Sequence, residues 1–293
     1  MKTYLDCFPC VVRHALDAAR FSSNDEALHR KVLNETMQEL IGLPTEVTPP
    51  EITARIHRII KRVTGNPDPY QPVKRKYNEI ALAMYPELKK KVTTAKEPLR
   101  MATRLAIAGN IIDFGALGES FDLKATISKV LDSGFDIDDY DAFEQAVNHA
   151  SHILYLGDNA GEIVFDKILI EEIKRISNAR ITFVVKHEPI INDATLTDAR
   201  FVGMDAVANL ITNGYDAPAT VLDHVSPEFK QAWETADLVI AKGQGNYETL
   251  SDEHQRNIFF LLKIKCPVLA RDIGGRVGDT VIKQSFLKKA QPI

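Results

Sequence analysis

The sequence predicts an α/β protein, in which a helical N-terminal part precedes an α/β/α sandwich with a mostly parallel sheet. In the first half, apolar residues recur at helical spacing, and no convincing strand precedes about residue 150. In the second half, short runs rich in Ile, Val and Leu alternate with longer helical patterns, which is typical of parallel strands joined by right-handed crossovers. We therefore expect a mainly helical domain over residues 1–145 and an α/β/α domain over residues 146–293.

The helices of the first half are predicted from four apolar patterns and from the turn-rich stretches between them. The patterns are CVVRHALDAARF, EALHRKVLNETMQELI, PEITARIHRIIKRVTG and EPLRMATRLAIAGNII. Turn-rich stretches lie at 42–50 and 65–72. Thr48, followed by two prolines and Glu51, marks a helix start. The segment YDAFEQAVNHA could serve either domain, so the boundary lies within 135–150.

The sheet of the second half is predicted from its apolar runs. The expected strands cover 152–157, 181–186, 206–214, 237–243 and 265–270. Between them lie helical patterns, among them GEIVFDKILIEEIKRI and PEFKQAWETA. A sheet of this kind is covered by helices on both faces.

Composition limits the functions that this chain can have. The net charge of −4 argues against a dedicated nucleic-acid surface, which would carry a basic excess. No apolar run reaches the roughly 18 residues that span a bilayer, and no signal peptide is apparent. Three cysteines, an odd number, do not suggest a disulfide framework. We expect a cytoplasmic protein with neither membrane nor nucleic acid as a partner; no feature predicts its oligomeric state.

Polar residues follow three of the predicted strands. Asp158 and Asn159 end the first strand, Asn192 and Asp193 follow the second, and the residues from Lys242 to Asn246 end a later one. In open α/β sheets, ligands bind outside the carboxyl ends of the strands, and those ends share one edge of the sheet. We therefore expect these residues to converge on one site.

The residue types at this edge point to phosphate chemistry. Two carboxylates and an amide oxygen suit Mg²⁺ or Mn²⁺. A lysine can balance a phosphate, and glycines let backbone N–H groups approach its oxygens. A helix that begins near Gly161 would add a partial positive charge. Together these groups predict a site that hydrolyses a phosphate ester with an activated water.

Each of these residues also has a purely structural interpretation. Asp158 and Asn159 could be turn and cap residues, and Asp193 could cap the helix ATLTDARFV. A lysine such as Lys242 is commonly solvated at the end of a strand, and GQGN alone is a weak glycine loop. From the residues alone, the structural and the functional interpretation stay open.

Three motifs in combination resemble the metal-dependent damage-control phosphatases, long treated as a domain of unknown function. The motifs are LGDNAGEIVFD, INDATLTDA and KGQGNYETL. The CFPC stretch at 7–10 and AGNIIDFG at 108–115 resemble the subfamily marked by an N-terminal CxxC, whose members are often archaeal stand-alone proteins. The resemblance covers nearly the whole chain and implies a helical part joined to a Rossmann-like α/β/α domain.

The resemblance also implies an activity and a set of site residues. The activity is the hydrolysis of phosphomonoesters such as sugar phosphates or damaged phosphometabolites, with Mn²⁺, Co²⁺, Ni²⁺ or Mg²⁺ as the metal. Asp158, Asn159 and Asp193 would bind the metal and act in catalysis, and Lys242 would contact the substrate phosphate. We expect further substrate contacts from the residues beside Lys242, namely Gly243, Gln244 and Asn246. Another branch of the family has an Arg-Thr-x-Lys motif near the C-terminus where this chain has ARDIGG, so the roles of Arg271 and Lys283 stay open.

The helical part contributes further candidates. Asn110, which the resemblance favours, and Asp113 could reach the cleft, or could be a helix C-cap and a solvated acid. Glu162 could bind substrate or orient a metal-bound water, or it could be an acid favoured in the first turn of a helix.

The CxxC pair, Cys7 and Cys10, has several interpretations. The pair could be redox-active or could form half of a zinc site with Cys266 and His14 as the other ligands. Packing against the adjacent domain is the interpretation that we favour.

Two other functions compete with the phosphatase. One is an S-adenosylmethionine-dependent methyltransferase or nucleotide binder, because a strand followed by GDNAGE loosely resembles a nucleotide-binding turn; the G-x-G-x-x-G spacing is missing. The other is a non-enzymatic binding module built around the CxxC pair. For the phosphatase, we prefer attack by activated water over a phospho-aspartate formed on Asp158.

Overall fold

The N-terminal part of the chain is helical, as predicted. The computed structural model describes residues 1–44, 46–111 and 134–285, without the side chains at 110–111. Its first helices are α1 (Cys7–Ser22), α2 (Glu26–Ile41), α3 (Pro49–Thr64), α4 (Gln71–Thr93) and α5 (Pro98–Ile111). A capping box between Thr48 and Glu51 starts α3, with proline in the first turn, which confirms the predicted start.

The strands form one seven-stranded sheet in the order β1-β7-β6-β5-β2-β3-β4. They are β1 (Ile137–Asp138), β2 (His152–Leu156), β3 (Arg180–Val185), β4 (Asn209–Thr212), β5 (Leu238–Lys242), β6 (Ile258–Lys263) and β7 (Thr280–Gln284). Neighbouring strands run parallel except β6 and β7, which are antiparallel. The predicted mixed fold with a mostly parallel sheet is therefore confirmed.

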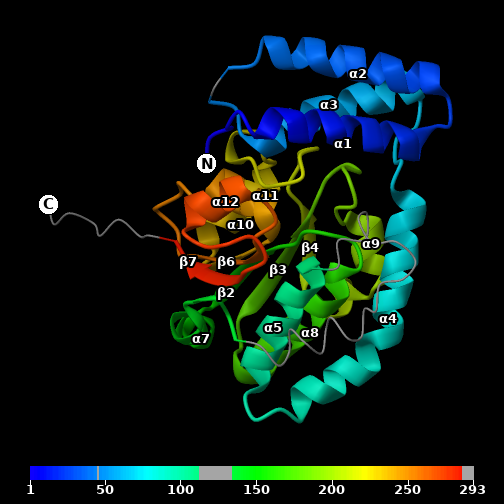
Figure 1. Cartoon of the computed structure of the whole chain (residues 1–293). Helices are drawn as coiled ribbons and strands as arrows, with labels where there is room; N and C mark the ends of the chain where they lie inside the picture. Colours follow the sequence, from blue (N-terminus) through cyan, green and yellow to red (C-terminus); the bar gives the residue numbers. More distant parts are fainter. Residues whose placement is uncertain (45, 112–133, 286–293) are drawn as a thin grey trace, which may run out of the picture.

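Helices cover both faces of the sheet (Figure 1). They are α7 (Tyr140–His149), α8 (Glu162–Ile176), α9 (Leu196–Phe201), α10 (Pro227–Thr235), α11 (Gly243–Leu250) and α12 (Pro267–Ile273), with short 3₁₀ turns η1 (Met204–Ala206) and η2 (Leu222–His224). Successive residues of a strand face opposite sides. Ile153 and Tyr155 of β2 accordingly pack in one core with α5 and α8, while Leu154 and Leu156 pack in another with α10, α11 and α12.

One of the five strand predictions was wrong, and three strands were missed. The run at 265–270 is not a strand, because Cys266 caps α12 and Pro267 occupies its first position. The strand of that region is β6, an apolar run directly before it, and β7 after it was also missed. The two-residue β1 pairs with β7 before residue 150, where we expected no strand. A short apolar run does not distinguish a strand from a buried helix, which explains the first error.

The first three helices form a separate cluster at the carboxyl end of the sheet (Figure 1). A fork of two hydrogen bonds from Arg58 of α3 to Asp216, at 2.8 and 2.5 Å, ties this cluster to the loop after β4. By contrast, α4 and α5 belong to the core of the sheet, where Leu105 packs with Phe143 and Tyr155. Helical segments from both sides of residue 145 thus share one core, and the proposed domain division stays a prediction.

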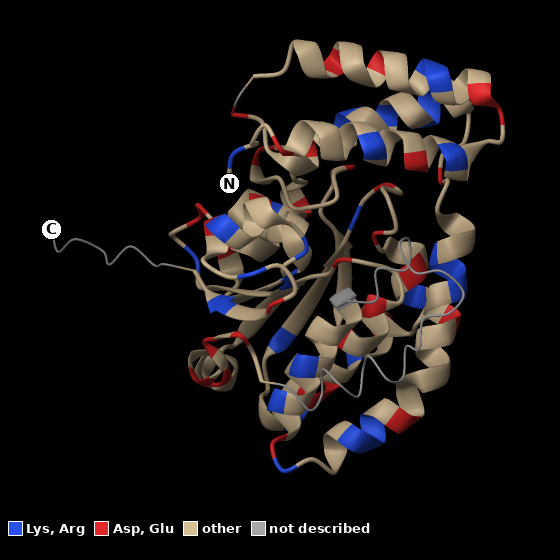
Figure 2. Ribbon diagram, in the orientation of Figure 1, with Lys and Arg blue, Asp and Glu red and all other residues tan. Residues whose placement is uncertain are grey.

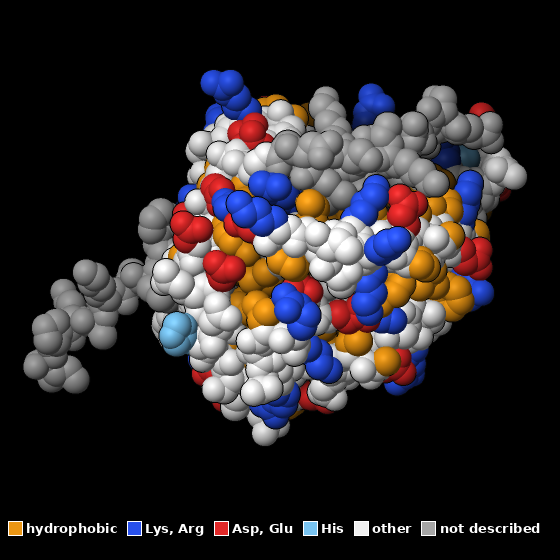
Figure 3. Space-filling model, turned by 90° about the horizontal axis from the view of Figure 1, so that it is seen from below, with side chains coloured by type: hydrophobic (Ala, Val, Ile, Leu, Met, Phe, Trp, Pro, Cys, Tyr) orange, Lys and Arg blue, Asp and Glu red, His pale blue; other side chains and the backbone are white. Residues whose placement is uncertain are grey.

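The surface carries charges of both signs. Basic and acidic residues are interspersed along α1 to α4 (Figure 2). On the face seen from below, charged side chains lie among small apolar patches (Figure 3). Among the helices of the described ranges, none combines the length and the apolar character that crossing a membrane requires.

Candidate active site

The strand ends that carry the predicted residues are neighbours in the sheet. β2 lies between β3 and β5, so the turns after all three open onto one edge. The chain leaves β2 toward β3 through α8 on one face and reaches β5 through α10 on the other face. The ends of β2 and β5 therefore flank a topological switch point, the position where ligands bind in open α/β sheets.

The turns after β2 and β3 are joined directly. Asn159 and Asp193 form an isolated antiparallel bridge. The Ala160 N–H donates to the Asn192 carbonyl at 2.9 Å, and the Ala194 N–H donates to the Asp158 carbonyl at 2.8 Å. The side chains are nearly buried, with exposed fractions of 8% for Asp158, 9% for Asn159 and 3% for Asp193. The structure thus brings the three expected metal ligands together.

None of these three side chains caps a helix. Thr195 is the N-cap of α9, in a capping box with Asp198. Gly161 is the N-cap of α8 and its N–H donates to Asn78 Oδ1 at 2.7 Å. The cap interpretations of Asp158, Asn159 and Asp193 are therefore not supported, and the N-terminus of α8 already has a partner from α4.

The amide of Asn159 is oriented by two carboxylates. Its Nδ2 donates to Asp158 Oδ2 at 2.9 Å and to Glu162 Oε2 at 3.0 Å. Ionised carboxylates only accept hydrogen bonds, so the nitrogen must face them. The carbonyl oxygen Oδ1 then points away from both and is available as a hard oxygen ligand.

The N-terminus of α11 lies against Asp158. Gly243, the first residue of this helix, has a φ of +79°, and a Cβ built on it would lie 2.0 Å from Asp158 Oδ2. No side chain caps this helix end. Only glycine permits both the backbone conformation and the approach of the carboxylate. Free N–H groups at a helix N-terminus form an anion site.

The other residues of the KGQGN stretch have partners within the protein. Gln244 Nε2 donates to Glu248 Oε1 at 2.7 Å, and Asn246 Nδ2 donates to the Lys242 carbonyl at 2.8 Å. Asn246 Oδ1 accepts from the Thr220 N–H at 2.9 Å. These side chains therefore hold the loop together, and Gly243 is the residue of the stretch that lies against Asp158.

Lys242 is buried among acceptors. Its Nζ donates to Glu162 Oε1 at 2.5 Å, to Asp166 Oδ1 at 2.6 Å and to the Ala106 carbonyl of α5 at 2.9 Å. Asp166 also accepts from the hydroxyl of Tyr155 at 2.7 Å. The ammonium of Lys242 is thus part of the wall beneath the site.

Buried carboxylates outnumber the buried ammonium groups at this edge. Asp158, Glu162, Asp166 and Asp193 lie beside Lys186 and Lys242, and the charges of Lys74 and Lys265 act on Asp193 and Asp158 respectively. Burial, with the nearby Glu162 and Asp193, raises the pKa of Asp158 well above its usual value. Burial also raises the pKa of Asp166 and of Asp193 to about 6. A divalent cation would offset this excess.

The donor set fits a hard divalent metal. Asp158 and Asp193 supply carboxylate oxygens and Asn159 supplies an amide oxygen, the donors that Mg²⁺ and Mn²⁺ prefer, with water at the remaining positions. No group of three or more His, Cys, Asp or Glu side chains in the described ranges is arranged to enclose a metal. A site in which an amide and waters complete the coordination agrees with that finding.

Comparison with known proteins decides the family. A family model described as the damage-control phosphatase ARMT1-like domain matches residues 3–281. The chain belongs to this family. A damage-control phosphatase of Archaeoglobus fulgidus is 36% identical over 282 residues, which cover 94% of this chain and 97% of the relative. A damage-control phosphatase of Pyrococcus horikoshii is 36% identical over 289 residues, which cover 98% of this chain and 100% of the relative.

A solved structure agrees with these matches. The crystal structure of a DUF89 family protein from Pyrococcus horikoshii has a TM-score of 0.91 to this chain at 35% identity, over 97% of this chain and 99% of that one. Membership of the damage-control phosphatase family makes the chain a phosphatase, which confirms the predicted class of enzyme. Its place in the CxxC subfamily stays a prediction.

Sequence reasoning missed several residues at the site of this phosphatase. Lys186 Nζ donates to the Gly157 carbonyl at 3.0 Å and lies 3.3 Å from Asp193 Oδ2. The exposed Lys265 lies close enough to Asp158 to lower the pKa of that carboxyl against the larger effect of burial. Lys186 is the last residue of the strand predicted over 181–186, so the strand-end rule could have found it. Lys265 falls in a segment that was assigned wrongly.

Some candidates are elsewhere or are not described. Asp113 and the side chain of Asn110 lie outside the described residues. A Cβ on their neighbour Gly109 would lie 3.0 Å from Glu162 Cγ, so the end of α5 packs against the site. Arg271 pairs with Asp6 at 3.1 Å on the surface, and Lys283 lies on β7.

The three cysteines are free thiols, close enough for their charges to interact. Cys7 and Cys10 lie in the first turn of α1, and Cys266 caps α12. Burial raises the pKa of Cys7 and of Cys10, and the charges of Glu248 and Cys266 add to this effect. The histidine that we considered with them, His14, pairs instead with His57, at 2.8 Å between their Nε2 atoms.

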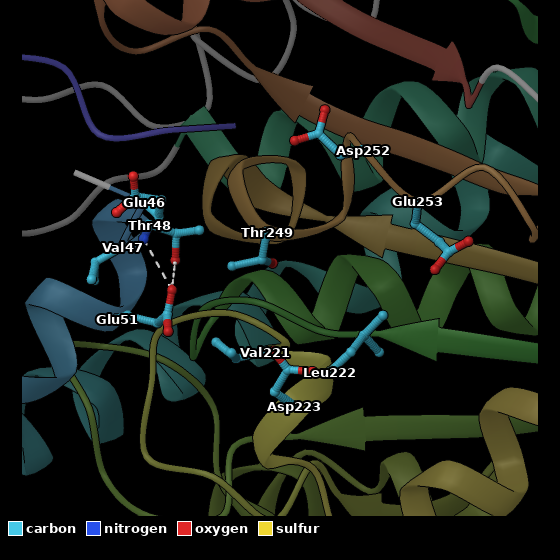
Figure 4. A pocket seen from close by; sticks show the side chains of 10 residues that line it. All are labelled: Glu46, Val47, Thr48, Glu51, Val221, Leu222, Asp223, Thr249, Asp252 and Glu253. Atoms are coloured by element: carbon cyan, nitrogen blue, oxygen red, sulfur yellow. Dashed lines mark hydrogen bonds between the residues drawn. The ribbon is translucent and has the colours of Figure 1, made fainter. Parts of the chain in front are cut away.

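A cavity of about 520 Å³ lies at the other end of α11 (Figure 4). It lies between the start of α3, the η2 turn and the end of α11. Its lining includes five acidic residues, Glu46, Glu51, Asp223, Asp252 and Glu253, and no basic residue. An acidic lining without a basic residue disfavours a phosphorylated ligand, so the strand ends that hold Asp158 and Asp193 are the better candidate.

Proposed function

We propose that this phosphatase hydrolyses phosphomonoesters of small metabolites, sugar phosphates or damaged phosphometabolites among them, with a divalent metal held by Asp158, Asn159 and Asp193. The observation that carries the proposal is the convergence of Asp158, Asn159 and Asp193, all nearly buried, at neighbouring strand ends beside the uncapped N-terminus of α11. Mn²⁺, Co²⁺, Ni²⁺ and Mg²⁺ are the candidate metals. We further propose that the enzyme works in the cytoplasm.

The chain offers one element for each part of the reaction. The N–H groups at the start of α11, from Gly243 onward, would receive the phosphate oxygens, which the partial positive charge of the helix end also attracts. A bound divalent metal would neutralise phosphate charge and lower the pKa of a water. Near the switch point, the phosphate would lie between this helix end and the Asp158 and Asp193 carboxylates.

Water is the better nucleophile in this arrangement. Asp158 Oδ2 accepts a hydrogen bond from Asn159 and lies against Gly243, so this oxygen is already surrounded. A covalent phospho-aspartate would require Asp158 to leave these contacts. Asp158 therefore serves as a ligand and not as the attacking group.

The test is p-nitrophenyl phosphate hydrolysis by metal-stripped protein, with Mn²⁺, Co²⁺, Ni²⁺, Mg²⁺ or Zn²⁺ added back singly. We expect turnover only with an added metal, followed by hydrolysis of members of a sugar-phosphate panel. Turnover that is unchanged by metal removal would contradict the metal proposal. Absence of turnover with every metal and every phosphate ester would contradict the function itself.

A further inference from the structure

The ammonium of Lys242 has no hydrogen-bond donor left for a substrate. An ammonium has three N–H bonds, and Lys242 directs them to Glu162, Asp166 and the Ala106 carbonyl at 2.5 to 2.9 Å. Its side chain has an exposed fraction of 0%. A lysine that contacts substrate phosphate would need at least one N–H directed into the cleft.

Glu162 connects this lysine with the proposed metal ligands. One oxygen, Oε1, accepts from Lys242, and the other, Oε2, accepts from Asn159 Nδ2 at 3.0 Å. Glu162 is buried in the first turn of α8. If Glu162 rotated, Asn159 would lose one of the two acceptors that turn its amide nitrogen away from the metal position.

Asp166 is the second carboxylate that accepts a hydrogen bond from Lys242. It lies one helical turn after Glu162, accepts from Lys242 at 2.6 Å and receives the Tyr155 hydroxyl at 2.7 Å. Tyr155 belongs to β2, the strand that ends at Asp158. The contacts therefore form a closed path from β2 through α8 and β5 back to the turn after β2.

We propose that Lys242, Asp166 and Tyr155 form a positioning relay that holds Glu162, and through it the Asn159 amide, in the orientation that binds the metal. This inference rests on the proposed function. It makes Lys242 a positioning residue and leaves phosphate binding to the N-terminus of α11. Partners of this kind, which orient metal ligands, commonly change metal affinity about 10- to 100-fold when they are removed.

The test separates metal affinity from phosphate affinity. In Lys242→Gln, we expect the metal Kd, measured by calorimetry, to rise about 10-fold or more. The Kd of inorganic phosphate, measured at saturating metal, should stay within about 2-fold of wild type. Glu162→Gln should show the same pattern, because its amide can present a donor to Asn159 Nδ2. Lys89→Gln removes a surface lysine that pairs with Glu171 at 2.8 Å and should change neither constant.

Two further variants test the relay if Lys242→Gln does not fold. Lys242→Gln combined with Asp166→Asn removes one charge of each sign, and circular dichroism would verify its fold. Tyr155→Phe keeps the ring and removes one hydrogen bond, so the metal Kd should rise about 2- to 5-fold. In any folded relay variant, an unchanged metal Kd with a phosphate Kd raised 10-fold would overturn the relay and restore a phosphate contact for Lys242.

Wild-type protein distinguishes the two proposals. If the wild type neither binds a divalent metal nor hydrolyses phosphate esters, the proposed function fails. If the wild type does both and the relay variants keep its metal Kd, only the relay fails.

Discussion

The two ends of α11 both gather carboxylates, but they differ in burial and in charge pairing. At the N-terminal end, Asp158 has an exposed fraction of 8% and lies among buried acids and lysines. At the C-terminal end, the side chain of Asp252 has an exposed fraction of 84% and borders an open cavity. The cavity thus lies at the C-terminal end of the helix, and the buried group of Asp158, Asn159 and Asp193 lies at the N-terminal end.

This difference shows which feature indicates a metal site. A solvated carboxylate is stable without a counter-charge. Burial disfavours the charged form of a carboxylate and raises its pKa, so that a bound cation or a proton stabilises it. Asp193, at the N-terminal end of α11, is such a buried carboxylate, and burial raises its pKa to about 6. A group of carboxylates buried together is therefore a better guide to the site than the volume of a cavity.

Removing a carboxylate from the buried end should have the largest effect. We expect Asp158→Asn to lower kcat/KM by about three orders of magnitude, since the metal contributes several kcal/mol of transition-state stabilisation. The same change should raise the Tm of metal-free protein, because it relieves repulsion with Glu162 and Asp193. Steady-state kinetics and thermal unfolding measure the two effects. Wild-type turnover in this variant would contradict the assignment of the metal site to the N-terminal end of α11.

A methyl group at the start of α11 should act next most strongly. In Gly243→Ala, the Cβ would lie 2.0 Å from Asp158 Oδ2 at a φ of +79°. We expect turnover to fall about 100-fold, because Asp158 or the helix end must move. Gly274→Ala is the matched control: its φ is +82° and its Cβ would meet nothing within 4 Å, so it should cost about 1 kcal/mol of stability and leave turnover unchanged. Equal turnover in the two variants would contradict this role of Gly243.

The pH dependence of stability should depend on the metal. The pKa of Asp166 and of Asp193 is raised by burial to about 6 in the folded protein, against about 4 in an unfolded chain. The folded state therefore binds more protons between these values. Its extra stability is complete below about pH 4 and is lost as the pH rises through 6.

Thermal unfolding at pH 5 and pH 7.5 measures this effect. Metal-free wild type should lose more stability between these pH values than Asp193→Asn, by about 1.4 kcal/mol. Saturating metal should reverse the trend, because metal binds the deprotonated carboxylates. An identical pH dependence in wild type and variant, both without metal, would show that the pKa of Asp193 is not raised in the folded protein.

Substitutions in the acidic cavity should have the smallest effect on turnover and stability. Asp223→Asn combined with Glu253→Gln removes two charges from its lining. We expect kcat/KM within about 2-fold of wild type and a stability change below about 0.5 kcal/mol, as for other surface substitutions. A large loss of turnover in this variant would assign the cavity a role in the reaction and so weaken the contrast between the two ends.

The sequence predicted which polar residues lie together at this edge better than it predicted their contacts. Asp158, Asn159, Asp193 and Lys242 could be placed together because apolar runs reveal where parallel strands end, and those ends share an edge. The contacts of Lys242 could not be predicted, because its acceptors come from α5 and α8, and their approach depends on packing.

Two other features illustrate the same limit. Asn78 reaches Gly161 from α4, 83 residues earlier in the chain, and no local pattern marks it. The run at 265–270 was assigned to a strand because short apolar runs are ambiguous, although Pro267 at the first position of a helix was a readable signal.

The most direct test of the central claim is calorimetric titration of metal-stripped protein with Mn²⁺ at pH 7.5, on wild type, Asp158→Asn and the Asp223→Asn, Glu253→Gln variant. We predict one strong site in the wild type, its loss in Asp158→Asn, and its retention in the cavity variant. Retention in Asp158→Asn with loss in the cavity variant would place the metal at the other end of α11 and contradict the account.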